Sequence, residues 1–224
     1  MSFQRIEVER PCPGTALTAP DAVDLTHFTH LNSHGRRLIR GWLRRAVARE
    51  DGNQADSFEA FIFMWIAYNG WAACCTEEDA DTLQNRLTAS SEALRFRFQD
   101  LLERNARFAA GLTAFHSLWP IFNAREIRTD QLAESPDARP DKVDYYLANG
   151  ISYEPRCFLT HLHRNQPIPM DWPHTLYATY RVRCNLFHGE KAAHLEADRT
   201  MVDAALQAML PFVSDLLTPD ADEW

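Results

Sequence analysis

One stretch constrains the fold of this 224-residue chain more than any other. The run "FEAFIFMWIAYNGWAACC", from Phe58 to Cys75, is apolar on nearly every side if it is wound as a helix. A helix of that kind is stable in water only when other elements surround it, so it belongs in the middle of a bundle. Its most apolar part is shorter than the roughly 20 residues needed to cross a bilayer, and it contains Asn69. We therefore expect a central core helix and no membrane span.

The rest of the chain favours helices as well. Apolar residues make up 46% of it, only 8 residues are glycine, and alternation of apolar and polar residues is rare. Amphipathic spacing predicts further helices over residues 35–50, 90–115 and 195–217. Another helix is expected to begin at Asp171, a capping residue, with Pro173 in its first turn.

These patterns predict one all-α domain. We expect a helical bundle of four to six main helices over residues 35–217. An N-terminal arm and a short segment precede it over residues 1–34, and a tail follows over residues 218–224.

Charge and cysteine usage narrow the class of protein. The net charge of −8 means that nucleic-acid binding would need a local basic patch. The five cysteines form no CxxC pair and no zinc-like spacing, and the first residues lack an apolar secretory core. We therefore expect a cytoplasmic protein with reduced thiols, without a cofactor and without a metal. His161 and His163 are interpreted as polar residues around Leu162.

Three histidines near the N-terminus are candidate zinc ligands. His27, His30 and His34 fall within about 60° of one another on a helical wheel. No cysteine or carboxylate was found to complete the set, and His34 precedes a glycine. The expectation of no metal site therefore stands.

The segment "YRVRCNLFHGEK", from Tyr180 to Lys191, does not look like ordinary packing. Arg183 lies in the middle of an apolar arc, although a guanidinium keeps its charge and needs partners when it is buried. His188 lies about 140° from Arg183 on a regular helix and aligns instead with Arg181. Gly189 is the residue type that ends helices, so ideal angles are a poor guide there. Helix geometry thus nominates Arg183 or Arg181 as the partner of His188 and leaves both open.

The string "VRCNLFHGEK" resembles the ribonuclease motif of the HEPN superfamily, in which an arginine precedes a histidine by four to six intervening residues. It is similar to a prokaryotic branch with an "RxNLFHGxK" signature, and "WIAYN", "WPIFNAREI" and "IPMDWPHTLYATY" resemble that branch too. The resemblance covers most of residues 35–217. It implies a HEPN-like bundle that acts as a homodimer and cleaves RNA without a metal. The position two residues after the histidine is Glu190 rather than the tyrosine that some members carry, so regulation through that tyrosine is not expected.

The resemblance implies that Arg183 and His188 are catalytic. A neutral imidazole can take the proton from an RNA 2′-hydroxyl, and a guanidinium can stabilise the charge that develops on the phosphate. Asn69 is expected to support Arg183 or His188. Asn185 and Lys191 are expected to orient the loop or contact phosphate. Arg181 remains the other candidate arginine.

A stripe of arginines on the predicted helix over residues 35–50 is a candidate RNA-binding surface. Its members are Arg36, Arg37, Arg40 and Arg44. The same stripe also has the composition of an ordinary solvated face.

Together these features predict an endoribonuclease of the toxin or phage-defence type, with RNA as substrate and an antitoxin or other protein regulator as a candidate partner. The alternative is a catalytically inactive HEPN-like module that binds RNA, nucleotide or a protein. A plain dimerisation bundle is a third class. In these readings Arg183 is a structural arginine, His188 stabilises a helix end, and Asn69 is a packing amide.

Overall fold

The computed structural model describes residue 12 and residues 23–50, 56–129, 142–188 and 196–218. These ranges contain eleven helices and one pair of short strands, which confirms the predicted all-α class. Five of the helices have 13 or more residues. In chain order the elements are α1 (Thr26–His30), α2 (Ser33–Glu50), α3 (Asp56–Thr76), α4 (Asp81–Ser90), α5 (Glu92–Arg104), α6 (Ala106–His116), β1 (Ile121–Phe122), α7 (Ala124–Thr129), α8 (Lys142–Ala148), β2 (Tyr153–Glu154), α9 (Phe158–His163), α10 (Trp172–Phe187) and α11 (Glu196–Leu217).

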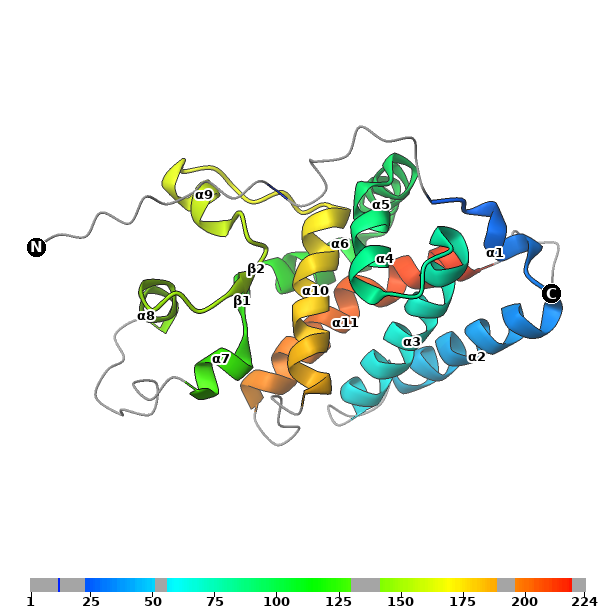
Figure 1. Ribbon diagram of the computed structural model, residues 1–224, viewed down its shortest axis with the longest axis horizontal. Helices are drawn as coiled ribbons and strands as arrows, with labels where there is room; N and C mark the ends of the chain where they lie inside the picture. The colour runs from blue at the N-terminus through cyan, green and yellow to red at the C-terminus, as the bar shows by residue number, and fades with distance from the viewer. Residues whose placement is uncertain (1–11, 13–22, 51–55, 130–141, 189–195, 219–224) are drawn as a thin grey trace, which may run out of the picture.

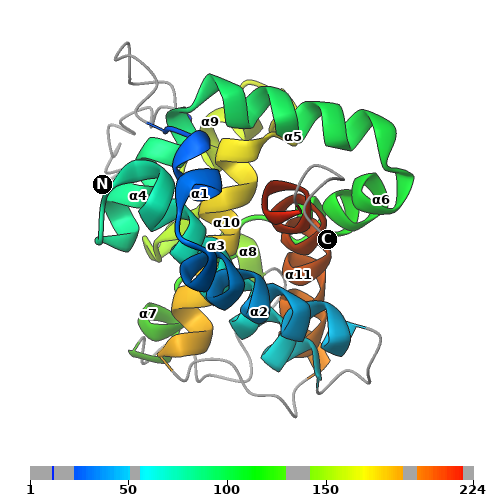
Figure 2. The same cartoon turned by 90° about the vertical axis from the view of Figure 1, so that its right-hand side faces the viewer.

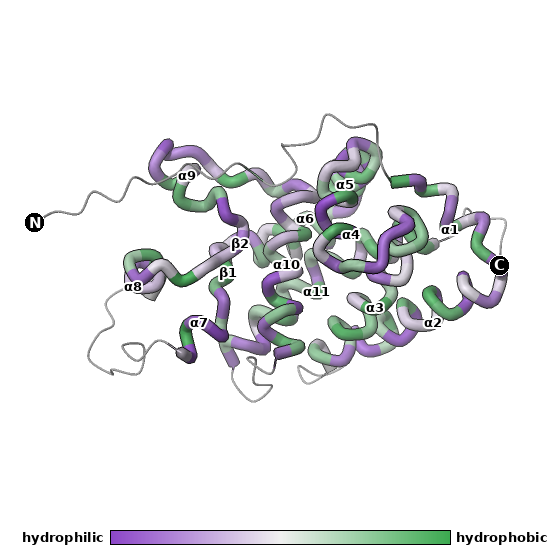
Figure 3. Tube along the Cα trace, viewed as in Figure 1, coloured by the Kyte–Doolittle hydropathy of each residue, from purple (hydrophilic) through white to green (hydrophobic). Residues whose placement is uncertain are grey.

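The central helix is α3, as its all-round apolar sequence predicts. It packs against α1, α2, α4 and α11, and the side chains of Phe61, Met64, Trp65 and Tyr68 are buried. Among the described helices, α11 alone is long and apolar enough to cross a bilayer, and most of it is buried inside the bundle. Figure 3 shows green and purple alternating along α2, as expected for a helix with one face on the core.

An aromatic cluster joins three helices at the centre of the bundle. The Trp172 ring of α10 lies 4.8 Å from the Phe212 ring of α11 and 5.8 Å from the Phe98 ring of α5. The indole N–H of Trp172 donates to the carbonyl oxygen of Thr88 at 2.8 Å. Because the buried indole is paired, this cluster fixes the beginning of α10 without leaving a polar atom unsatisfied.

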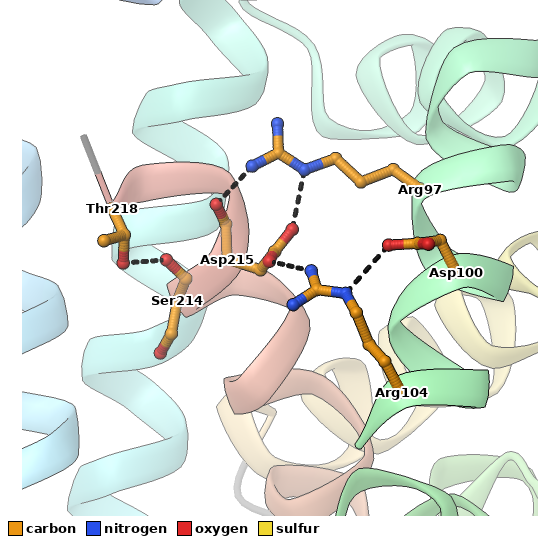
Figure 4. Close-up of polar contacts among 6 residues, drawn as sticks. All are labelled: Arg97, Asp100, Arg104, Ser214, Asp215 and Thr218. Atoms are coloured by element: carbon orange, nitrogen blue, oxygen red, sulfur yellow. Dashed lines mark hydrogen bonds and ion pairs between the residues drawn. The ribbon is translucent and has the colours of Figure 1, made fainter. Parts of the chain in front are cut away.

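Charged side chains fasten α5 to the end of α11. Asp215 accepts hydrogen bonds from Arg97 and Arg104, and Arg104 also donates to Asp100 of its own helix (Figure 4). The second guanidinium nitrogen of Arg97 donates to the carbonyl oxygen of Asp215. These bonds neutralise Asp215 on two sides.

Most of the small elements lie at one end of the molecule, and the short helix α1 lies at the other. Figure 1 shows α7, α8, α9 and the two strands together on one side of α10, and α2, α3 and α4 on the other. The strands are antiparallel, with Ile121 opposite Glu154 and Phe122 opposite Tyr153. Figure 2 shows the bundle from its end, with α5 along the top and α2 in the lower half.

Three expectations about helix boundaries are corrected. The helix predicted over residues 90–115 is broken at Asn105, whose side chain accepts from the N–H of Phe108 and so begins α6 as a new helix. The helix predicted from residue 35 begins at Ser33 instead, and α1 before it buries Phe28 in the core.

The third correction concerns the three N-terminal histidines. They do not share a helix, because Leu31 has an extended backbone between α1 and α2. His27 instead lies 3.3 Å from the carboxylate of Asp24. The wheel that brought these histidines together therefore does not apply.

Candidate functional site at the end of helix α10

Helix α10 begins where its sequence predicts. The carboxylate of Asp171 accepts from the N–H of His174 and caps the first turn, and Pro173 lies in that turn. The helix stays regular to Phe187, and His188 follows as the C-cap residue, with its N–H bonded to the carbonyl oxygen of Cys184 at 3.1 Å. Gly189 and Lys191 lie outside the described residues.

Arg183 joins three helices through one carboxylate. Its Nη2 lies 2.9 Å from Oδ2 of Asp81, the first residue of α4, and Asp81 Oδ1 accepts from Asn69 of α3 at 3.3 Å. Asn69 is therefore connected to Arg183 through Asp81 rather than directly. A carboxylate in the first turn of α4 is also favoured by the helix dipole.

The guanidinium of Arg183 is held but not sealed. It lies 4.7 Å over the Phe187 ring and 5.9 Å over the Tyr180 ring, and the side chain is 22% exposed. Its Nε is buried and has no hydrogen-bond partner among the described residues, and the same is true of Asn69 Oδ1. Burial and the neighbouring Cys184 raise the pKa of Tyr180 to about 12, so this hydroxyl is neutral near pH 7. A cation with unused donors thus lies beside neutral aromatic surface.

His188 is exposed at the end of the helix. Because α10 is regular to Phe187, the Cα of His188 lies about 140° around the axis and roughly 7.5 Å along it from that of Arg183. No hydrogen bond or ion pair joins the imidazole to either candidate arginine within the part of the chain that the structure describes. One chain therefore presents Arg183 and His188 at the same end of α10 but in different directions.

Arg181 faces another set of charges. Glu126 of α7 and Glu154 of β2 both feel its positive charge. Burial raises the pKa of Glu154 more than Arg156 and Arg181 lower it. Burial also acts to raise the pKa of Glu126, but hydrogen bonds from Ser152 and Asn123, with the charge of Arg181, lower it overall. Arg181 thus belongs to the acidic side of α10, and Arg183 to the α4 side.

Asn185 is a structural residue in this chain. It is buried, its Oδ1 accepts from the N–H of Ala124 at 3.1 Å, and its Nδ2 donates to the carbonyl oxygen of Phe122 at 2.9 Å. Both ends of the amide are therefore occupied by the segment between β1 and α7. The expectation that Asn185 orients a loop or contacts phosphate stays a prediction beside these two bonds.

The four arginines of the stripe predicted on α2 divide into two kinds. Arg36 donates to the carbonyl oxygen of Thr29, and Arg40 donates to that of Leu217 at 3.0 Å, where it closes the end of α11. Arg37 and Arg44 are exposed. Only these last two keep the solvent exposure that a phosphate-binding surface requires.

The sequence reasoning missed Asp81 and a second cluster at the other end of α10. The signal for Asp81 was an acidic residue at the expected position for starting a helix, after "TEEDA". The second cluster contains Cys12, Cys157, His161 and His174, whose potential ligand atoms lie within 4.8 Å of one another. Its signal was the spacing of Cys157 and His161, four residues apart, which places both on one face of a helical turn.

Comparison of the chain with models of protein families, with curated proteins and with solved structures gave no match. Only the chemistry of the side chains therefore indicates a function.

Proposed function

We propose that this chain is a metal-independent endoribonuclease of the HEPN type, acting in the cytoplasm as a homodimer in a toxin or defence role. The observation that carries the proposal is the state of Arg183. It is held by a single ion pair, it is partly exposed, and it lies at the helix end that also presents His188.

The donors of Arg183 suit a phosphate. A guanidinium has five N–H donors, and the contact with Asp81 uses only the Nη2 group. Asp81 and the ring of Phe187 restrict the side chain, so fewer rotamers are lost when an anion binds. Arg183 would then stabilise the negative charge that develops on the phosphorus during cleavage.

His188 supplies the base in this proposal. Its imidazole would take the proton from the RNA 2′-hydroxyl, whose oxygen attacks the adjacent phosphorus. The bond from phosphorus to the 5′-oxygen breaks, and that oxygen takes up a proton as it leaves. The products are a 2′,3′-cyclic phosphate and a 5′-hydroxyl. Since Arg183 and His188 of one chain point in different directions, a second copy would bring the complementary residue to each site.

The test is RNA cleavage by purified wild type and by His188→Ala, with His30→Ala as a matched control because His30 is also exposed at a helix end. The assay contains a magnesium chelator, and circular dichroism verifies that the helices persist in it. We expect wild type and His30→Ala to produce cyclic-phosphate ends, and His188→Ala to lose about 100-fold or more of the rate. Equal rates for all three proteins would overturn the assignment of His188.

A second function is favoured by the ion pair itself. Asp81 offsets the charge of Arg183, and an arginine already paired with a carboxylate attracts phosphate less strongly. A non-cleaving module that binds RNA, nucleotide or a protein regulator fits this observation. Fluorescence anisotropy with labelled RNA separates the two functions, because the module binds RNA without producing new ends.

A further inference from the structure

A second group of side chains meets at the N-terminal end of α10, away from Arg183. Cys12 comes from the N-terminal part of the chain, Cys157 and His161 from the turn and helix of α9, and His174 from the first turn of α10. Their potential ligand atoms lie within 4.8 Å of one another, and Cys12 Sγ is 3.2 Å from His161 Nε2. The four residues come from three separate parts of the sequence.

The imidazole of His174 points to a ligand independently of the others. Its side chain is only 2% exposed, and its Nδ1 is bonded to Oδ1 of Asp171 at 2.5 Å. Its Nε2 is buried and has no hydrogen-bond partner among the described residues. A buried nitrogen of this kind normally has a partner. A carboxylate on one imidazole nitrogen, with the other nitrogen left open, is the arrangement that orients a histidine toward a metal.

We propose that Cys12, Cys157, His161 and His174 bind one zinc ion. Two thiolates and two imidazoles are a donor set that zinc prefers. The two thiolates offset the charge of the zinc ion, and a complex of small net charge suits a half-buried site. Bonds of about 2.3 Å to sulfur and 2.0–2.1 Å to nitrogen place tetrahedral ligand atoms roughly 3.3–3.8 Å apart. A contraction of about 1 Å from the widest spacing in the cluster therefore reaches coordination geometry.

The ion would be structural rather than catalytic. Four protein ligands fill a tetrahedral zinc and leave no position for water or substrate. Cys157 and His174 are buried, and Cys12 and His161 are half-buried. The site would fasten Cys12, which is 149 positions from His161, to α9 and to the start of α10. Asp171 would serve both as the cap of α10 and as the support of His174.

The sequence concealed this site because the two cysteines are separated by most of the chain. No CxxC pair marks it, and His161 alone looks like an ordinary polar residue. The proposal is independent of RNA cleavage, since none of the four ligands belongs to the site at the other end of α10.

The experiment measures zinc bound to the full chain purified in reductant. Elemental analysis should find about one zinc per chain, and titration with a coloured chelator gives the affinity. Cobalt substituted for zinc should give the visible absorption of a tetrahedral thiolate site. Thermal melting by circular dichroism should show a higher Tm with zinc than after chelation, because only the folded chain assembles the ligands.

Two matched pairs of variants locate the site. His161→Ala and Cys12→Ser should each weaken zinc binding by at least 10-fold, and both residues are half-buried, so the bundle should still fold. His163→Ala and Cys74→Ser, which lie outside the cluster, should bind zinc as wild type does. Asp171→Asn keeps a capping oxygen but removes the charge, and should weaken zinc binding roughly 10- to 100-fold.

The proposal is overturned if the folded, reduced wild type takes up no stoichiometric zinc. It is also overturned if His161→Ala and Cys12→Ser bind zinc as tightly as their controls. The zinc site is likewise overturned if the purified protein contains a disulfide between Cys12 and Cys157 and binds no zinc after that disulfide is reduced.

Discussion

Two aspartates, Asp215 and Asp81, each join helices of this bundle through arginine side chains. They differ in how many arginine contacts they make. Asp215 is 17% exposed, and its carboxylate accepts from Arg97 and from Arg104 at 2.6 Å each. Asp81 is 29% exposed and contacts Arg183 once, at 2.9 Å, and its other oxygen accepts from an amide. The Nε of Arg97 is bonded to Asp215, while the Nε of Arg183 has no partner among the described residues.

This difference separates an arginine that holds two helices together from an arginine that can still bind a ligand. A guanidinium whose fork is already bonded to carboxylate and carbonyl oxygens contributes to holding two helices together. A guanidinium with one end-on contact and unused donors can bind an additional anion. On these grounds Arg97 belongs to the architecture, and Arg183 keeps donors with which it can bind a further anion.

The largest expected effect tests that separation directly. Arg183→Ala should reduce RNA cleavage about 100-fold or more, because it removes the group that stabilises charge on the phosphate. Its cost in unfolding free energy should be only about 1 kcal/mol, since the pair that it breaks is single and partly exposed. Arg97→Ala should do the reverse, with a normal cleavage rate and a lower stability. Initial rates on a defined RNA and urea unfolding curves measure the two quantities.

The same result on both variants would remove the distinction. If Arg97→Ala lost activity as strongly as Arg183→Ala while both remained folded, the unpaired donors of Arg183 would not distinguish it as the catalytic arginine. Arg183→Lys adds a further control, because it keeps the charge and loses the fork.

Asn185, two positions from Arg183, should behave as architecture. Asn185→Ala leaves the half-buried N–H of Ala124 and carbonyl of Phe122 without their side-chain partner, which should cost about 2–3 kcal/mol of unfolding free energy. Asn149→Ala is the control, since Asn149 is exposed and makes one bond to the carbonyl of Tyr145. The free energy of unfolding from urea titrations checks the difference; equal values for the two variants would show that the buried amide is not what joins β1 to α10.

Asp215→Ala should have a smaller effect, about 1–2 kcal/mol, because Arg97 and Arg104 are 39% and 53% exposed and water can replace part of what they lose. Asp100→Ala removes only the contact within α5 and should leave stability almost unchanged. Thermal melting of both variants measures this. An Asp215 variant as stable as Asp100→Ala would mean that the ion pairs in Figure 4 do not contribute to stability.

The sequence predicted the helices whose own residues decide them. The all-round apolar run of α3, and the capping Asp171 with Pro173 of α10, are local signals, and both helices begin within a residue or two of where they were expected. Asn105 was missed because the apolar spacing continues on both sides of it, from Phe98 to Phe108, and conceals the cap. The two-residue strands were beyond prediction, since their pairing joins residues that are far apart in the chain.

For the candidate site, sequence patterns named Arg183 and Asn69 but not the residue between them. A polar side chain on an apolar face indicates that a partner exists, and only the packing of α4 against α10 shows that the partner is Asp81. Tertiary packing is likewise needed to tell Arg181 from Arg183. Helix angles gave two directions, and the neighbouring carboxylates differ between them.

The smallest expected effect concerns the direction in which Arg181 lies. Glu126 has a lowered pKa in the folded chain, so folding favours its ionised form. Its stabilisation is therefore fully present above the ordinary value of 4.5 and is lost as the pH falls through the lower folded value. Glu126→Gln should destabilise the chain by about 1 kcal/mol at pH 7 and by progressively less in acid, as urea unfolding at several pH values would show.

Taking the difference between wild type and Glu126→Gln removes the opposite contribution of Glu154. The pKa of that carboxyl is raised by burial, so its contribution is lost as the pH rises, but it is present in both proteins and cancels. Arg181→Met should then shrink the pH-dependent difference, because part of the lowering at Glu126 comes from the charge of Arg181. Arg183→Met should leave that difference as it is. If both methionine variants changed it equally, the two arginines would not face different sides of α10, and the choice of Arg183 over Arg181 would lose its basis.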